Sequence, residues 1–196
     1  MHGLDRGKSR PARRAVFVDR DGVINIDHGY VHKIEDFTFI DGATDALRRL
    51  QAAGYLLVVA TNQSGIARGL YTEVDYLNLT ARMHERLRSA GVTLASVEYC
   101  PHLPDAQVER YRVDCNCRKP RPGMLQRAAA KLDIDLSASI LVGDRTSDIE
   151  AGRAAGVSLC YLVRTGKPLC ERESALADAV FDDLVVCANG VLGSES

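Results

Sequence analysis

The sequence predicts an α/β protein in which a doubly wound, mainly parallel sheet lies between two layers of helices. Short apolar runs alternate along the chain with segments whose apolar residues recur at helical spacing, and this alternation is typical of a parallel sheet. The run from Tyr55 to Ala60 reads YLLVVA without interruption, as expected for a strand that is covered on both faces. A chain of 196 residues is long enough to bury a sizeable core as one domain.

The predicted elements follow one another in a regular order. The four apolar residues Ala15–Val18 predict the first strand. Ala43–Ala53 has apolar residues at helical spacing and is followed by Gly54, so a helix is expected there. After the strand Tyr55–Ala60, the pattern predicts a helix from Thr72 to about Ala90, a strand at Thr93–Tyr99, a helix at Gly123–Leu132, a strand at Ser139–Val142, a helix at Asp148–Ala155, and strands at Ser158–Val163 and Ala179–Phe181.

Two segments, Gly22–Gly42 and Cys100–Pro122, lack regular patterning. Each is longer than an ordinary connection, and loops of this length in a compact domain commonly serve function. Ahead of the first strand, residues 1–14 contain several arginines and a lysine but no apolar run, which predicts a basic, flexible tail. We therefore expect a single domain at 15–190 after this tail.

The composition narrows the partners that the protein can have. A net charge of −1 argues against general attraction to nucleic acids or to membranes. No apolar stretch is long enough to predict a transmembrane helix, and no export signal is recognised, so the cytoplasm is the expected location. Six cysteines in such a chain are not expected to form a disulfide framework.

Polar residues follow several of the predicted strands. The first strand runs directly into Asp19 and Asp21, although a solvated acidic turn explains this pair of acids equally well. Thr61 follows the second strand, Asp144 follows the strand Ser139–Val142, and Lys119 precedes the helix at Gly123. Because the carboxyl ends of parallel strands meet at one edge of a sheet, these side chains are expected to lie close together.

Together these groups have the composition of a phosphoryl-transfer site. Carboxylate oxygens are the ligands that Mg²⁺ prefers, and a hydroxyl and a lysine suit phosphate oxygens. Each residue alone has a simpler explanation: Thr61 as a turn former, Lys119 as a solvated surface charge and Asp144 as a helix cap. Their occurrence in this order favours an acidic Mg²⁺ site beside a cationic phosphate cradle.

Three cysteines and one histidine are grouped within the second long loop. Cys100-Pro101-His102 is followed further along by Cys115-Asn116-Cys117. Three thiols and one imidazole form a complete ligand set for a tetrahedral structural zinc ion, whereas the alternative is free loop cysteines beside a surface histidine. We expect a zinc loop at 100–117 in which Zn²⁺ is bound by Cys100, His102, Cys115 and Cys117.

The order of the site residues resembles that of the haloacid dehalogenase (HAD) superfamily of phosphatases. The stretch DRDG at 19–22 is similar to its first motif, Thr61 to its second, Lys119 to its third, and Gly143-Asp144 with Asp148 to its acidic fourth. The resemblance spans residues 15 to about 165. It implies a HAD-like Rossmannoid fold and hydrolysis of a phosphomonoester through an aspartyl-phosphate.

The resemblance also implies a role for each matching residue. Asp19 would be the nucleophile and Asp21 the general acid and base. Thr61 and Lys119 would hold the transferring phosphoryl group. The implied Mg²⁺ ligands are Asp19, Asp21 through its main-chain carbonyl, and Asp144.

Three stretches narrow the resemblance within the superfamily. They read DHGYV at 27–31, TNQSGIARG at 61–69 and CPH…CNCRKP across the zinc loop. They are similar to a capless subgroup related to histidinol-phosphate phosphatases, whose members act on a small sugar bisphosphate. This implies a cytoplasmic, usually monomeric enzyme with catalytic Mg²⁺ and structural Zn²⁺. The implied substrate contacts are Asp27, His28, Gly29, Tyr30, Asn62, Gln63, Ser64, Arg145 and, for the second phosphate or the sugar, Arg118.

Alternative functions share parts of this pattern. Histidinol-phosphate phosphatases have the aspartate pair and a similar zinc loop, but with a shorter stretch between the two half-sites and no DHGYV. A 3′-phosphatase acting on nucleic acid is disfavoured because only 6% of the residues are aromatic. Signalling receiver domains also form an aspartyl-phosphate, but they are shorter and have no zinc loop. A purely structural zinc module leaves Asp19, Asp21 and Asp144 unexplained.

Overall fold

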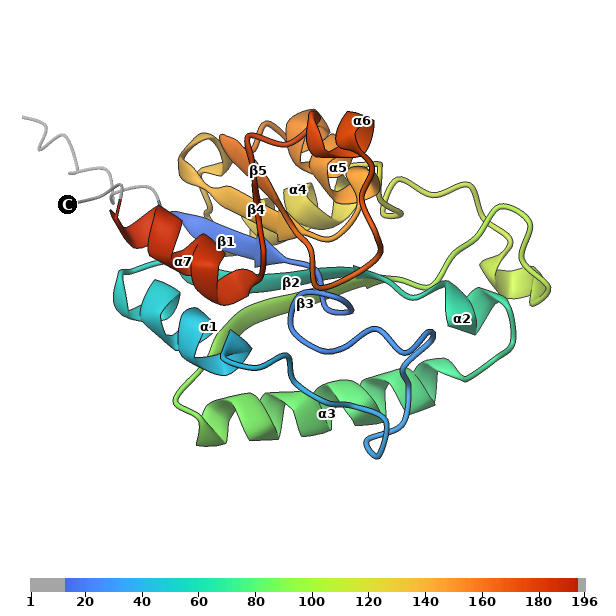
Figure 1. The fold of residues 1–196 in the computed structure, drawn as a ribbon. Helices are drawn as coiled ribbons and strands as arrows, with labels where there is room; N and C mark the ends of the chain where they lie inside the picture. Colours follow the sequence, from blue (N-terminus) through green and yellow to red (C-terminus); the bar gives the residue numbers. More distant parts are fainter. Residues whose placement is uncertain (1–12, 194–196) are drawn as a thin grey trace, which may run out of the picture.

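The computed structural model describes residues 13–193 and is built around one six-stranded sheet (Figure 1). Its strands are β1 (Ala15–Val18), β2 (Leu56–Asn62), β3 (Leu94–Cys100), β4 (Ile140–Gly143), β5 (Leu159–Val163) and β6 (Ala179–Phe181). They lie in the order β3-β2-β1-β4-β5-β6, and every neighbouring pair is parallel. The predicted α/β class with a parallel sheet is therefore confirmed.

Helices cover both faces of this sheet (Figure 1). One face packs against α1 (Ala43–Ala52), α3 (Glu73–Ser89) and α7 (Leu184–Gly193), and the other packs against α4 (Gly123–Leu132) and α5 (Thr146–Ala155). Side chains of β1 alternate between the two cores, with Val16 and Val18 in the first and Ala15 and Phe17 in the second. The three layers expected from the sequence are thus present.

All ten predicted elements occur within two residues of their expected bounds. Strand β2 continues two residues beyond its expected end, to Asn62, so Thr61 lies inside the strand and pairs with Tyr99 of β3. Helix α7 was not predicted because almost all of its residues, LVVCANGVLG, are apolar and show no helical periodicity. The short elements in the connections, also not predicted, are α2 (Ser64–Ala67), α6 (Glu171–Ser174) and the 3-10 turns Glu109–Tyr111 and Leu136–Ala138.

The basic tail predicted ahead of the first strand is shorter than expected. The Arg13 side chain donates to the carbonyl of Leu132 at 3.1 Å, and the Arg14 side chain donates to the carbonyl of Ala53 at 2.8 Å. Both acceptors lie at helix C-termini, where carbonyl groups lack partners within the helix and cations are favoured. The two arginines therefore belong to the domain, and the rest of the predicted tail, residues 1–12, lies outside the described residues.

The strand order creates a topological switch point between β1 and β4. In open α/β sheets, ligands bind beyond the carboxyl ends of the strands at such a point. Loops rather than a cap domain follow β1 and β3 in the described part of the chain, in agreement with the capless arrangement expected from the sequence (Figure 1). Within residues 13–193, no helix has the length and apolar character that a membrane crossing requires.

Candidate active site

A cavity of about 400 Å³ opens at the switch point. Every predicted catalytic residue lines it, and so does every predicted substrate contact except His28, which is exposed. Three further residues line the cavity that the sequence reasoning missed: Tyr71, Ser147 and Lys167. The predicted site residues therefore come together from β1, β2, both long loops and the start of α5.

Asp19 follows β1 directly and faces a buried lysine. Lys119 Nζ lies 3.1 Å from Asp19 Oδ2 and 2.5 Å from Asp148 Oδ1, and it donates to the carbonyl of Ala60 at 2.7 Å. Burial by itself lowers the pKa of Lys119, but the carboxylates of Asp148 and Asp19 outweigh it and raise the pKa, so the side chain remains an ammonium ion. Burial raises the pKa of Asp19 against the opposing effect of Lys119.

Asp19, Asp144 and Asp148 form an acidic cluster in which one carboxylate oxygen from each residue lies within 4.8 Å of the other two. Asp144 and Asp148 are buried, and Asp144 Oδ1 has no hydrogen-bond partner. Burial, reinforced by the charges of Asp19 and Asp148, raises the pKa of Asp144 to about 7. Hard anionic oxygens that are buried together, one of them without a partner, fit Mg²⁺ as a ligand set.

Two glycines leave room for the Asp144 carboxylate. Gly22 has a φ of +82°, and a Cβ at this position would lie 2.7 Å from Asp144 Oδ2. A Cβ on Gly166 would lie only 2.0 Å from the same oxygen. The loop of Gly166 is joined to Gly22, because the Thr165 hydroxyl donates to the Gly22 carbonyl at 2.6 Å. The side chain of Asp144 is thus enclosed by backbone on two sides.

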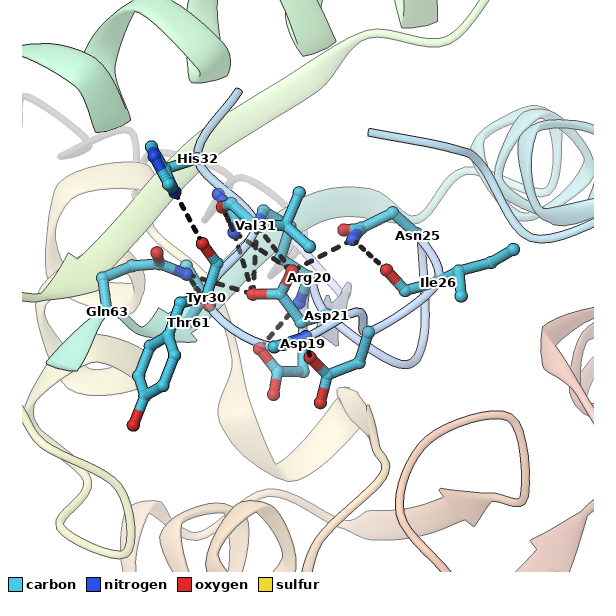
Figure 2. Close-up of polar contacts among 12 residues, drawn as sticks. Asp19, Arg20, Asp21, Asn25, Ile26, Tyr30, Val31, His32, Thr61 and Gln63 are labelled. Atoms are coloured by element: carbon cyan, nitrogen blue, oxygen red, sulfur yellow. Dashed lines mark hydrogen bonds and ion pairs between the residues drawn. The ribbon is translucent and has the colours of Figure 1, made fainter. Parts of the chain in front are cut away.

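Several side-chain donors surround the carboxylate of Asp21 (Figure 2). The fully buried guanidinium of Arg20 donates to both of its oxygens at 2.9–3.3 Å. Asn25 Nδ2 donates to Oδ1 at 3.0 Å, and Gln63 Nε2 donates to Oδ2 at 3.2 Å. These bonds fix the orientation of the carboxylate away from the acidic cluster, which leaves only the main-chain carbonyl of Asp21 as the expected metal ligand. Asp148, in contrast, lies within the cluster.

The amide side chains that follow Thr61 bond to protein groups at the cavity wall. Asn62 Oδ1 accepts from the Lys119 amide at 3.1 Å and Asn62 Nδ2 donates to the Lys119 carbonyl at 3.0 Å, so Asn62 fixes the backbone that carries Lys119. Gln63 Nε2 donates to Thr61 Oγ1 at 2.9 Å and to Asp21. Both amides line the cavity, where they were predicted to contact substrate, and their hydrogen bonds also give them a positioning geometry.

Cations surround Asp27 on the outer wall of the cavity. Arg145 Nη2 lies 3.3 Å and Lys167 Nζ lies 3.4 Å from Asp27 Oδ2. Burial by itself raises the pKa of Asp27, but the Gly29 amide and the two cations outweigh it and lower the pKa. Lys167 could have been expected from the sequence, because it lies in the loop that follows β5. Tyr71 and Ser147 carry no comparable signal.

The four zinc-ligand candidates also come together. Cys117 Sγ lies 3.2 Å from the sulfur atoms of Cys100 and Cys115, and 3.4 Å from His102 Nδ1. Burial raises the pKa of Cys100, whereas for Cys115 hydrogen bonds with the other thiols outweigh burial and lower the pKa to about 7. A set of three sulfurs and one imidazole nitrogen at these separations is compatible with a tetrahedral zinc site. Arg118, directly after Cys117, donates to the carbonyl of His102 at 3.4 Å.

The doubly wound sheet, with an aspartate beside a buried lysine and an acidic cluster at its switch point, defines a phosphatase of the HAD type. In agreement, residues 116–187 match the HAD-hydrolase-like family. The chain belongs to the family of D-glycero-beta-D-manno-heptose-1,7-bisphosphate 7-phosphatases. It is 50% identical to that enzyme from Yersinia pestis over 170 residues, covering 87% of this chain and 90% of the relative, and 51% identical to that from Escherichia coli K12, covering 87% and 89%.

Solved structures agree with this assignment. A D,D-heptose 1,7-bisphosphate phosphatase from B. bronchiseptica, complexed with magnesium and phosphate, superposes with a TM-score of 0.78 and is 33% identical over 92% of this chain and 99% of that chain. The corresponding phosphatase from Burkholderia thailandensis gives a TM-score of 0.65 at 30% identity, and the match covers 92% of this chain and 99% of that chain. The family resemblance seen in the sequence motifs is therefore confirmed.

Proposed function

We propose that this protein hydrolyses the 7-phosphate of D-glycero-beta-D-manno-heptose 1,7-bisphosphate and releases heptose 1-phosphate for nucleotide-activated heptose synthesis. One observation carries the proposal: relatives with this activity in their names share about half of their residues with nearly the whole chain, and the cavity holds the groups that the reaction needs. The sequence left the anomer at C1 open, and the names of these relatives favour the beta anomer.

The proposed reaction has two steps that use the same aspartates. An oxygen of Asp19 attacks phosphorus and the bond to the sugar oxygen breaks, while Asp21 gives that oxygen a proton. Water then attacks the aspartyl-phosphate, Asp21 takes the proton of the water, and phosphate leaves Asp19. The Lys119 ammonium group, 3.1 Å from Asp19, would neutralise charge on the transferring group, as would the Thr61 hydroxyl by donating a hydrogen bond.

We propose Mg²⁺ as the catalytic cofactor, with Asp19, Asp144 and the Asp21 main-chain carbonyl as its ligands. The unpartnered oxygen of Asp144 and the raised pKa of this carboxyl support the proposal, because both are relieved by a divalent cation. When bound, the ion supplies positive charge beside the phosphoryl oxygens. Asp148, which pairs with Lys119 at 2.5 Å, would hold the lysine in place beside this site.

Substrate selection is proposed to rest on the outer wall. Arg118 would bind the second phosphate or the sugar, because a guanidinium matches phosphate oxygens in a bidentate manner. Asp27, Gly29, Tyr30 and Arg145 line the same cavity and would contact the heptose. His28 does not line the cavity in this structure, so we assign it no contact.

We further propose that the cysteine and histidine cluster binds a structural Zn²⁺. Four ligands fill a tetrahedral site and leave no open position for catalysis. The ion would anchor the end of the zinc loop at Cys117, and Arg118 and Lys119 follow at once. The protein is proposed to act as a cytoplasmic monomer, which size-exclusion chromatography with light scattering tests.

A phosphate-release panel with Mg²⁺ tests the proposed function. It compares the beta and alpha anomers of the heptose bisphosphate with histidinol phosphate and a 3′-phosphorylated oligonucleotide, and phosphorus NMR identifies which phosphate is lost. The proposal predicts the highest kcat/KM for the beta anomer, with loss of the 7-phosphate. A higher kcat/KM for histidinol phosphate would contradict it.

A further inference from the structure

The side chain of Gln63 connects the two halves of the catalytic machinery (Figure 2). It is only 2% exposed and lies after the end of β2. Its Nε2 donates to Asp21 Oδ2 at 3.2 Å and to Thr61 Oγ1 at 2.9 Å, and its Oε1 accepts from the Tyr71 hydroxyl at 2.6 Å. One amide thus contacts the proposed acid, the proposed phosphate-binding hydroxyl and a buried phenol.

These partners allow only one orientation of the amide. Rotating it by half a turn would place Oε1 3.2 Å from Asp21 Oδ2, where it would repel the ionised carboxylate, or accept the proton of the carboxylic acid and turn it away from the leaving group. It would also turn Nε2 toward the Tyr71 oxygen and remove the donor from Thr61. In the observed orientation Thr61 Oγ1 accepts from Gln63, so the Thr61 proton is free to be donated into the cavity.

Tyr71 is itself held firmly in place. Its ring stacks on His32 with 4.8 Å between ring centres and 8° between planes, and His32 Nδ1 lies 2.8 Å from the carbonyl of Tyr30. A Cβ on Gly65 would lie 2.1 Å from the Tyr71 ring, so only glycine admits the ring at this place. Burial raises the pKa of Tyr71, which keeps the phenol protonated as a donor.

We propose that Tyr71 and Gln63 are positioning residues: the Tyr71 hydroxyl fixes the Gln63 amide, and the amide holds Asp21 in the orientation for proton transfer to the leaving group. The inference rests on the proposed function, because it takes Asp21 as the acid. It also gives the TNQSG stretch a physical meaning, since Gln63 bonds to Thr61 and Gly65 admits the ring that holds Gln63.

The test compares two substrates whose leaving groups differ in their need for a proton. The sugar oxygen of the heptose bisphosphate leaves as an alcohol and needs one, whereas p-nitrophenyl phosphate releases a phenolate that is stable without one. The quantity measured is kcat/KM with Mg²⁺, because it reports only the steps up to phosphoryl transfer to Asp19 and omits the later attack of water. Circular dichroism and zinc content establish that each variant is folded.

Two variants probe the pair, and two serve as references. Tyr71→Phe removes the hydroxyl and keeps the ring on His32, while Gln63→Leu removes the amide. Asp21→Asn removes the acid itself. Tyr111→Phe is the matched control. The Tyr111 ring packs in the same apolar cluster as Tyr71, but its hydroxyl donates to Glu73 at 2.9 Å, away from the cavity.

For the bisphosphate, Tyr71→Phe is expected to lower kcat/KM roughly 10-fold and Gln63→Leu roughly 100-fold. For p-nitrophenyl phosphate the loss of kcat/KM should stay below about 3-fold in Tyr71→Phe and below about 10-fold in Gln63→Leu, because only the effect through Thr61 remains. Tyr111→Phe should leave both values within about 2-fold. If Tyr71→Phe does not fold, Gln63→Leu decides the question.

Equal losses on both substrates in Tyr71→Phe and Gln63→Leu would overturn the inference, provided that Asp21→Asn still discriminates between them. The absence of any loss in the two variants would overturn it as well. If Asp21→Asn loses equally on both substrates, the acid assignment of the proposed function fails and the inference fails with it. The failure of the proposed function therefore gives a different pattern from the failure of the inference alone.

Discussion

Replacing Lys119 with methionine is expected to destabilise the fold as well as to stop catalysis. The Lys119 Nζ atom lies 2.5 Å from Asp148 Oδ1 and 3.1 Å from Asp19 Oδ2. The side chains of Lys119 and Asp148 are both buried, with 2% of each exposed. Removing one partner of a buried ion pair leaves uncompensated charge and typically costs about 3–5 kcal/mol. Because methionine fills nearly the same volume, cavity formation adds little to this cost.

The measurement is urea-induced unfolding followed by circular dichroism in Mg²⁺-free buffer at neutral pH. We expect the free energy of unfolding to fall by about 4 kcal/mol in Lys119→Met. The second substitution Asp148→Asn, made in the Lys119→Met background, removes the charge left behind and should restore at least about half of the loss. A loss below about 1 kcal/mol, or no recovery in the double variant, would refute this account of the buried ion pairs.

Three further predictions concern the metal sites. In Mg²⁺-free buffer the folded chain raises the pKa of Asp144 from 3.8 to about 7 and so binds a proton that the unfolded chain releases. The free energy of unfolding of the unmodified protein should therefore fall, relative to that of Asp144→Asn, as pH rises from about 4 to 7, and a difference that stays constant in urea titrations would contradict it. Gly166→Ala places a Cβ 2.0 Å from Asp144 Oδ2 and would displace this carboxylate. The Mg²⁺ concentration for half-maximal activity should therefore rise at least roughly 10-fold, and an unchanged Mg²⁺ titration would argue against Asp144 as a ligand. Cys117→Ser should lose zinc in elemental analysis and unfold at lower temperature, and retention of zinc would remove Cys117 from the ligand set.

Much of the site was predictable because backbone topology alone determines it. An apolar run that ends in Asp19 and Asp21 marks the end of a buried strand, and parallel pairing brings Thr61 and Asp144 to the same edge. The zinc-ligand candidates were predictable because their residue types are chemically distinctive. None of these inferences requires the orientation of a side chain.

The direction in which side chains point was not predictable. Asn62 and Gln63 follow Thr61, so the sequence predicts that they reach the cavity, as they do, but it gives no sign that their amides bond to Lys119 and to Asp21. These bonds depend on residues far away in the chain, and a single sequence carries no signal for such tertiary contacts. For the same reason the four side-chain bonds that Arg20 makes to Asp21, and those from Asn25 and Gln63, were not predicted.

The rate of Asp19→Asn with the beta anomer of the heptose bisphosphate and Mg²⁺ tests the central claim most directly. Asparagine preserves the shape of the side chain and removes the nucleophilic oxygen charge. The account predicts that kcat falls at least ~10³-fold while the circular dichroism spectrum and the zinc content match those of the unmodified protein. Turnover within about 10-fold of the unmodified protein would contradict an aspartyl-phosphate on Asp19.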